Sequence, residues 1–166
     1  MAAGNYSAGQ VRVRQTDAAG NASAVNSSFA AFSVDTTAAA TPTLNLAADT
    51  GSSGSDRITN TTTILISGLE PGGSWEFSTD AGNSWSAGSG SSFSVAAGNY
   101  SAGQVRVRQT DAAGNSSPVN SSFAAFSVDT TAAATPTLNL AADTGSSGSD
   151  RITNTTTILI SGLEPG

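Results

Sequence analysis

The side chains of this chain that could do chemistry are almost all oxygen donors. Twelve acids stand against six arginines, and the sequence contains no cysteine, histidine or lysine. A Ser-His-Asp triad, a thiolate or imidazole zinc site and a Schiff-base lysine therefore cannot be built. Catalysis would rest on carboxylates alone, and the pair Glu70 and Glu76 lies in a short segment with no evident cleft. We expect that the protein is not an enzyme.

Acidic and amide side chains recur in the segments GLEPGG, TDAAGN, DTGSSGSD and SVDTTAAATPT. Hard oxygens in glycine-containing loops suit the flexible coordination shell of Ca²⁺ better than the tight octahedron of Mg²⁺. DTGSSGSD is not an EF-hand, because it lacks acids at every second position and the closing Glu. The alternative is that Asp49, Asp111 and Asp129 only cap turns, and we assign Asp80 of STDAGNS to that class.

The elements that position these residues are expected to be strands. Short alternating apolar runs separated by Gly, Asn, Asp and Ser predict an all-β chain, and no segment has a helical apolar stripe. Seven short strands in about 90 residues are typical of an immunoglobulin-like β-sandwich. Trp75 and Trp85 are expected at its core and rim. The predicted strands are Thr43–Ala47, Thr61–Gly68, Ser74–Thr79, Ser84–Ala87, Ser91–Val95, Gly103–Thr110 and Ser121–Val128.

The chain is a tandem repeat with a period of 94 residues, which relates Tyr6 to Tyr100. Residues 2–72 and 96–166 differ at only two aligned positions, 22 and 24. This period is the size of an independently folding small domain rather than of a solenoid repeat. We therefore predict tandem domains joined by the short linker SVDTTAAATPT. The expected divisions are the last part of one repeat (1–39), a complete repeat (40–133) and the first part of the next (134–166).

Counting strands assigns the loops to the two ends of such a sandwich. At the end where the linker enters, the count places Asp35, Glu70, Asp111 and Asn115. At the opposite end it places Asp49, Asp56 and the outgoing Asp129. Gathered carboxylates are costly unless a cation or hydrogen bonds compensate, so we predict Ca²⁺ sites at these ends. The counterparts in the partial repeats are Asp17, Asp143, Asp150 and Glu164.

The combination of GLEPG, QTDAAGN, VDTTAAATP and DTGSSGSDRITN resembles the bacterial immunoglobulin-like repeats of giant Gram-negative surface adhesins, including biofilm-associated and RTX-type adhesins. The resemblance covers the whole chain. It implies an extracellular location at the bacterial cell surface and Ca²⁺ at the junctions between repeats. It also implies a stalk that holds a terminal ligand-binding region away from the cell. One departure is Ala40, which stands where related linkers often place a proline.

Near-identical copies favour a structural extender, because a spacer needs many units and no unit-specific surface. The alternative is a multivalent binding module for polysaccharide, ice or another cell surface, which would use Trp75, Trp85 or the threonines of TNTTT. Threonine in strands is nevertheless ordinary β-propensity. The net charge of −6 argues against nucleic acid as a partner. No run approaches the roughly 20 apolar residues of a membrane span, so membrane insertion is not expected.

The expected partners are neighbouring repeats of the same chain. The partial repeats at the two ends cannot close a sandwich alone, because the segment Gly73–Val95 occurs only once. They would expose Val13, Phe32, Ile158 and Ile160, which is costly. We therefore expect one of two arrangements: head-to-tail self-association of these ends with other copies, or a sequence that is a window on a longer chain.

Overall fold

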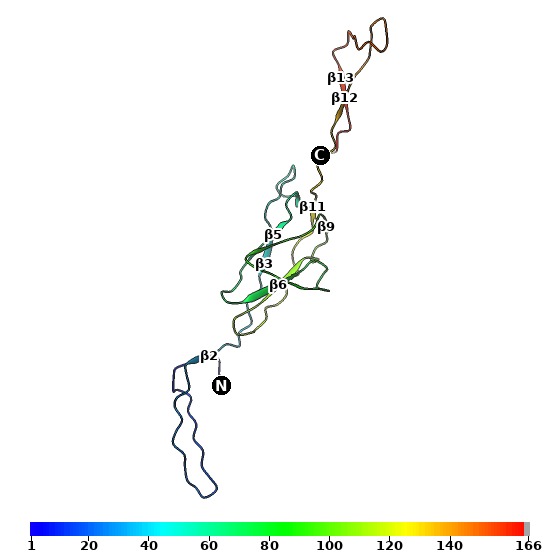
Figure 1. Cartoon of the computed structure of the whole chain (residues 1–166). Coiled ribbons are helices and arrows are strands. Elements are labelled where there is room, and N and C mark those ends of the chain that lie inside the picture. Colours follow the sequence, from blue (N-terminus) through cyan, green and yellow to red (C-terminus); the bar gives the residue numbers. More distant parts are fainter. Residues whose placement is uncertain (165–166) are drawn as a thin grey trace. The chain divides into compact units, whose positions relative to one another are not determined.

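The computed structural model describes residues 1–164, and every regular element within this range is a β-strand (Figure 1). The predicted all-β class is confirmed. The chain divides into two units, the first spanning Met1–Val128 and the second beginning at Asp129, and each is described by itself. Among the described residues there is no helix of the length and hydropathy needed to cross a membrane.

The complete repeat contains three sheets of three strands each (Figure 1). Its strands are β3 (Thr43–Leu46), β4 (Ile58–Thr59), β5 (Thr63–Ser67), β6 (Ser74–Ser78), β7 (Ser86–Ala87), β8 (Ser92–Ser94), β9 (Gly98–Tyr100), β10 (Arg106–Thr110) and β11 (Phe126–Val128). In the first sheet β5 pairs antiparallel with β3 and β8. In the second β6 pairs antiparallel with β10 and β7. In the third β11 pairs antiparallel with β9 and parallel with β4.

The core is formed by apolar side chains of all three sheets. On β5, Ile64 and Ile66 are buried while Leu65 between them is exposed, as the period of a strand requires. Phe77 of β6 stacks on Phe93 of β8 with ring centroids 4.1 Å apart, so side chains of the two sheets interdigitate. Each large apolar side chain buried in this way stabilises the fold by about 1.5–3 kcal/mol. Several sheets around one apolar core are consistent with a β-sandwich.

Each of the seven predicted strands has a counterpart, and the structure adds β4 and β9. β4 lies in a segment expected to be loop. It joins the third sheet because Arg57 adopts a φ of 63° and its carbonyl oxygen accepts a hydrogen bond from Ser127 N at 3.0 Å. β9 has the sequence GNY, and Gly and Asn are depleted in strands. Its Tyr100 ring stacks on Phe126 at 4.7 Å, which supplies the packing that propensity lacks.

The N-terminal partial repeat has one strand pair, in which β1 (Gly4–Tyr6) runs antiparallel to β2 (Phe32–Val34). These strands are the counterparts of β9 and β11. The 94-residue repeat predicts a counterpart of β10 in this segment, and this prediction is wrong: the segment makes only the isolated bridges of Val13 to Asn26 and Thr16 to Ala22. The reason is that β10 pairs with β6, and residues 1–39 contain no counterpart of β6.

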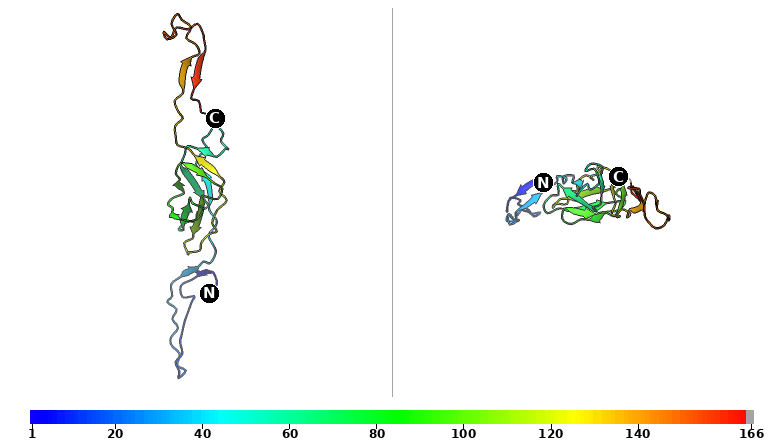
Figure 2. Two further views of the ribbon diagram at one scale, coloured as in Figure 1. Left: turned by 90° about the vertical axis from the view of Figure 1, so that its right-hand side faces the viewer. Right: turned by 90° about the horizontal axis from the view of Figure 1, so that it is seen from above.

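In the second unit β12 (Thr137–Leu140) pairs antiparallel with β13 (Ile158–Ser161) (Figure 2). Leu138 lies opposite Ile160, which is the register of β3 on β5. The burial differs greatly, because Ile160 is 57% exposed while its counterpart Ile66 is 5% exposed. Local sequence therefore specifies the strand pair, and the rest of a repeat supplies the burial.

Candidate functional site at the linker and the loop ends

The linker enters the complete repeat through hydrogen bonds from side chains to its backbone. The Ala40 amide donates to Glu70 Oε1 at 2.7 Å, and the Ala40 carbonyl oxygen accepts from Gln109 Nε2 at 2.7 Å. Gln109 Nε2 also donates to the Gly68 carbonyl oxygen at 2.9 Å, and its Oε1 accepts from the Glu70 amide at 2.9 Å. One buried amide thus joins the linker to the loop between β5 and β6.

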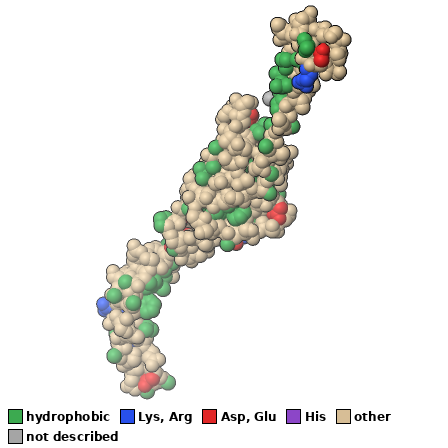
Figure 3. All heavy atoms as spheres, turned by 45° about the horizontal axis from the view of Figure 1, so that its top comes forward, with side chains coloured by type: hydrophobic (Ala, Val, Ile, Leu, Met, Phe, Trp, Pro, Cys, Tyr) green, Lys and Arg blue, Asp and Glu red, His purple; other side chains and the backbone are tan. Residues whose placement is uncertain are grey.

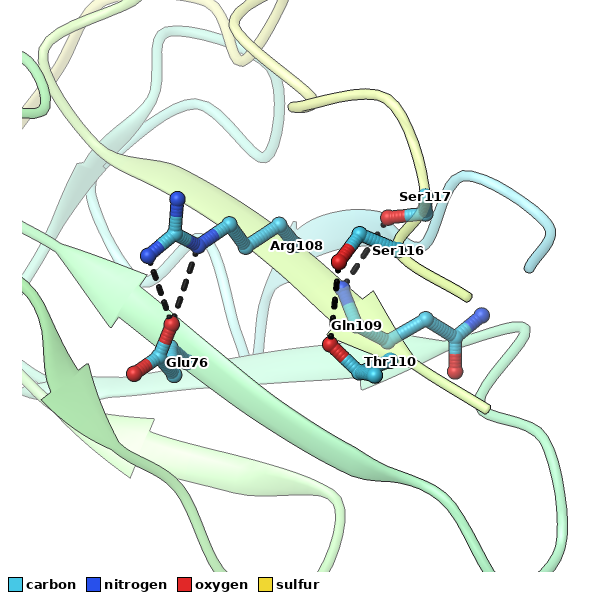
Figure 4. Close-up of polar contacts among 6 residues, drawn as sticks. All are labelled: Glu76, Arg108, Gln109, Thr110, Ser116 and Ser117. Carbon is cyan, nitrogen blue, oxygen red and sulfur yellow. Dashed lines mark hydrogen bonds and ion pairs between the residues drawn. The ribbon is translucent and has the colours of Figure 1, made fainter. Parts of the chain in front are cut away.

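Gln109 was not singled out from the sequence. It continues the inward positions of β10, where burial alternates along Arg106–Thr110, and it is 2% exposed. Figure 4 shows its side chain on the face of β10 opposite Arg108. Its backbone N–H donates to Ser117 Oγ at 3.0 Å. The signal in the sequence is a glutamine at the third inward position of VRVRQ, because an amide buried there must find hydrogen-bond partners.

Two asparagines hold the linker on either side of Ala40. Asn115 Nδ2 donates to the Asp35 carbonyl oxygen at 3.2 Å, and Asn120 Nδ2 donates to the Pro42 carbonyl oxygen at 2.8 Å. Pro42 is fully buried, so this end of the linker packs onto the repeat. Of the four residues expected at the entry end, Asn115 contacts the backbone of Asp35 directly.

Asp111 caps its own turn. Its Oδ1 accepts from the amides of Ala113 and Asn115, each at 2.8 Å, and its Oδ2 accepts from Asn115 Nδ2 at 2.9 Å. These hydrogen bonds, first that from the Asn115 side chain, lower the pKa of the Asp111 carboxyl. Asp111 therefore acts on the linker through Asn115, whose amide group it orients.

The acids of the long loop between β3 and β4 also accept backbone hydrogen bonds. Asp49 Oδ2 accepts from the Arg57 amide at 2.9 Å, and Asp56 Oδ1 accepts from the Ile58 amide at 2.9 Å. The second oxygen, Asp49 Oδ1, is buried and has no hydrogen-bond partner among the described residues. A buried carboxylate oxygen without a partner is rare in folded proteins and is usually met by water or an ion.

Arg57 holds this loop against the last strand of the repeat. Its Nε donates to the Ala125 carbonyl oxygen at 2.8 Å, and its guanidinium lies 4.9 Å from the centre of the Phe123 ring. A left-handed backbone at a residue other than glycine costs about 1 kcal/mol or more, which these contacts offset.

The partial repeats reproduce the local contacts. Asp17 caps its turn through Asn21, and the same interaction lowers its pKa. The Ala134 amide donates to Glu164 Oε1 at 2.9 Å. Asp143 Oδ2 accepts from the Arg151 amide at 3.0 Å, and its Oδ1, like that of Asp49, is buried without a partner among the described residues. Asp150 Oδ1 accepts from the Ile152 amide at 3.0 Å.

The predicted metal ligands thus fall into two groups, one around the linker and one in the loop between β3 and β4. Glu70 and Asn115 both contact the linker that carries Asp35, whereas Asp49 and Asp56 share a loop. Asp35 and Asp129 each cap the turn that follows them, through the amides two residues on. No three acidic side chains within residues 1–164 converge closely enough to hold a metal ion as they stand.

Several other polar and aromatic groups contact one another within the repeat. Arg108 makes an ion pair with Glu76 at 2.8 Å (Figure 4). Its guanidinium also lies 4.2 Å from the centre of the Trp85 ring. Trp75 is 7% exposed in the core, as predicted. Asp80 caps its hairpin through Ser84, which lowers the pKa of its carboxyl, so its assignment to turn capping is confirmed.

In comparisons with known proteins, neither a protein-family model nor a curated protein sequence matches this chain.

Proposed function

We propose that this chain is a stretch of immunoglobulin-like structural repeats that extends an adhesin of the bacterial cell surface. Function in such an array is carried by length, stiffness and copy number, without catalysis. The observation that supports this proposal best is the holding of Ala40, whose amide and carbonyl groups are both bound by side chains of the repeat that it enters. A repeat that holds its own linker restricts the angles open to its neighbour.

The composition of the linker supports the same function. The segment at 33–43 contains no glycine, and its Pro42 is buried against the repeat. A flexible connection would be rich in Gly and Ser and would leave its backbone in water. The near-identity of residues 2–72 and 96–166 also fits a spacer, in which every unit performs the same task.

We further propose that Ca²⁺ binds at the ends of the repeats. The donor chemistry fits, since Asp35, Glu70 and Asp111 offer hard oxygens around one linker. The carboxylates of Asp35 and Asp111 accept amide hydrogen bonds of their own turns, so an ion there would use their remaining lone pairs or shift these turns. At the other end, Asp49 Oδ1 is buried without a hydrogen-bond partner within residues 1–164, which favours a cation, and the same holds for Asp143 Oδ1.

Small-angle X-ray scattering on arrays of two, four and six complete repeats tests the extender function. We expect the maximum dimension to grow in proportion to repeat number, with a narrow distribution. Gln109→Leu in every repeat should broaden the distribution, because it removes the hydrogen bond to the Ala40 carbonyl oxygen.

The control is Gly88→Ala in every repeat, which disturbs the core beside Trp75 without touching the linker. It should lower the melting temperature and leave the dimensions unchanged. Wild-type arrays whose size grows only as the square root of repeat number would contradict the proposal, because that is the behaviour of flexibly joined units.

A further inference from the structure

Four asparagines of the complete repeat begin the triplet Asn-X-Ser/Thr, which is the acceptor motif for N-linked glycosylation. They are Asn60, Asn99, Asn115 and Asn120. Figure 3 shows that uncharged polar side chains and backbone make up most of the visible surface, and in a chain rich in Ser and Thr this spacing alone is weak evidence. The contacts of each triplet decide which asparagines can serve as acceptors. The Nδ2 atom must be free to react, and the hydroxyl of the third residue must be accessible.

The triplet that begins at Asn99 meets both requirements. Asn99 is exposed on β9, and its Oδ1 accepts a hydrogen bond from Ser127 Oγ at 2.7 Å. This bond holds the side chain by its oxygen and leaves the nitrogen to solvent. Neither Asn99 Nδ2 nor the hydroxyl of the exposed Ser101 has a hydrogen-bond partner within residues 1–164.

The triplet that begins at Asn60 is held in the same way. Asn60 is exposed just after β4, and its Oδ1 accepts a hydrogen bond from Thr50 Oγ1 at 3.1 Å. In the part of the chain that the structure describes, Asn60 Nδ2 and the hydroxyl of the half-buried Thr62 have no hydrogen-bond partner. Both reactive groups of this triplet are therefore also open.

The triplet that begins at Asn115 is closed by the fold. Asn115 Nδ2 donates to Asp111 Oδ2 at 2.9 Å, in addition to its contact with the linker. Its third residue, Ser117, is 8% exposed. Ser117 Oγ accepts from the Gln109 amide at 3.0 Å and donates to the Pro118 carbonyl oxygen at 2.8 Å. An enzyme can reach neither group without opening these contacts.

The triplet that begins at Asn120 is closed as well. Asn120 Nδ2 donates to the Pro42 carbonyl oxygen at 2.8 Å. The hydroxyl of its third residue, Ser122, donates to Asn120 Oδ1 at 2.9 Å. A sugar on this nitrogen would displace the buried Pro42 end of the linker.

We propose that Asn60 and Asn99 are acceptor sites for N-linked hexose from a nucleotide-activated donor, and that the fold excludes Asn115 and Asn120. In the transfer, Nδ2 forms a bond to C1 of the sugar while the bond from C1 to the nucleoside diphosphate oxygen breaks. The diphosphate leaves with the bonding electron pair and the nitrogen loses one proton, so no oxidant or reductant is needed. This inference does not depend on the proposed function.

The two open asparagines lie on the outer face of the third sheet. Asn99 is paired with Ser127 of β11, and Ser127 is paired with Ile58 of β4. Residues opposite one another in a sheet share a face, and Ile58 is 48% exposed. Asn60 lies two residues beyond Ile58, with the buried Thr59 between them. Sugars at both sites would therefore lie on the solvent side of the sheet and leave the core unchanged.

Mass spectrometry of the full chain after enzymatic transfer tests this. The folded protein is incubated with UDP-glucose and a soluble asparagine N-glycosyltransferase that accepts Asn-X-Ser/Thr, and is then digested with trypsin. Cleavage at arginine places Asn60 and Asn99 in peptide 58–106 and Asn115 and Asn120 in peptide 109–151. We expect two hexoses on the first peptide and none on the second. An unmodified first peptide, or hexose on the second, would overturn the proposal.

Short synthetic peptides, each carrying one of the four triplets, are the unfolded control. All four should accept glucose from the same enzyme and donor, because none is then held by the fold. If the peptides of Asn115 and Asn120 stayed unmodified, local sequence would explain the selection, and exclusion by the fold would be contradicted.

Ser101→Ala tests the assignment of Asn99. The substitution removes a hydroxyl with no hydrogen-bond partner within residues 1–164, so the melting temperature should not change. We expect peptide 58–106 to carry one hexose instead of two. Ser101→Thr restores a hydroxyl and should restore the second hexose, and Asn60→Gln should remove the other one. Two hexoses in Ser101→Ala would overturn Asn99 as an acceptor, and two in Asn60→Gln would overturn Asn60.

Discussion

Ala40 and Glu70 are joined by a hydrogen bond of 2.7 Å, and their counterparts Ala134 and Glu164 repeat it at 2.9 Å. The second pair lies in a unit that contains no counterpart of Gln109. The contact therefore needs only the linker and the first strand pair of a repeat. Gln109 then adds the bond to the Ala40 carbonyl oxygen when a complete sandwich forms. Two contacts therefore hold the linker. The one with Glu70 is local, and the one with Gln109 depends on the closed fold.

Gln109→Glu should destabilise the complete repeat at neutral pH. The new carboxylate oxygen would face the carbonyl oxygens of Ala40 and Gly68, where the amide group of Gln109 donates to both. A buried unpaired charge costs several kcal/mol unless it is neutralised. The protonated acid can donate again, so the folded pKa of the new group rises and stability returns as the pH falls below it. Denaturant unfolding at pH 7 and pH 4.5 measures this.

The repeat supplies the control for this variant. Gln15 is the counterpart of Gln109 and is exposed, so Gln15→Glu should change stability by less than about 0.5 kcal/mol at either pH. Equal effects at the two positions would mean that Gln109 does not hold the linker.

Gly88→Ala should destabilise the core. A Cβ at this position would lie 2.2 Å from two atoms of the Trp75 ring, and the Gly88 amide donates to the Trp75 carbonyl oxygen at 2.9 Å. Either the ring or the strand must move, which costs about 1–3 kcal/mol. Urea unfolding followed by tryptophan fluorescence measures the change. Gly54→Ala, with no atom within 4 Å of its Cβ, should have little effect.

Much of the fold follows from local sequence. Alternation predicts β5 and β10, and the identical strand pair β12–β13 forms where most of the core is absent. β4 and β9 could not be predicted, because they depend on partners far along the chain. The carbonyl oxygen of Arg57 meets Ser127, and Tyr100 meets Phe126. Composition of a short segment carries no signal for such pairings.

The arrangement of side chains around the linker was predicted in part, and metal binding there stays a prediction. Counting strands correctly brought Asn115 and Glu70 to the linker. It did not find Gln109 or Asn120, because neutral amides in a chain rich in polar residues have no distinctive spacing. It also did not anticipate that Asp111 would act through Asn115, since turn capping and metal ligation use the same residue types at the same spacing.

Stability should fall at acid pH through the carboxylates that cap turns. The folded pKa values of Asp80 and Asp111 are lowered, for Asp80 first by the hydrogen bond from the Ser84 side chain and for Asp111 by that from Asn115. A depressed folded pKa contributes stability that is present above the unfolded pKa, about 3.9, and is lost as the pH falls through the folded value. Melting temperatures between pH 5 and pH 2 should therefore fall less in the double variant Asp80→Asn, Asp111→Asn than in the wild type. Parallel curves would contradict this origin.

Calcium should raise the melting temperature of the repeat. The free energy of unfolding should increase by about 2.7 kcal/mol when the free ion is a hundredfold above its dissociation constant. A chelator should reverse the rise, and equal Mg²⁺ should give little response, because its octahedral shell fits flexible loops poorly. Asp111→Ala should abolish most of the calcium-dependent rise in melting temperature. The reason is that Asn115 donates hydrogen bonds both to Asp111 and to the linker at Asp35.

Asp80→Ala is the matched control for the calcium experiment. Each carboxylate caps its turn by accepting a hydrogen bond from the backbone amide four positions on, so both substitutions remove a cap and lower the melting temperature in the absence of metal. Only Asp111 is joined to the linker, so only its loss should remove the response to Ca²⁺. Equal calcium shifts in the two variants would place the ion elsewhere, and identical wild-type melts with and without Ca²⁺ would contradict calcium binding altogether.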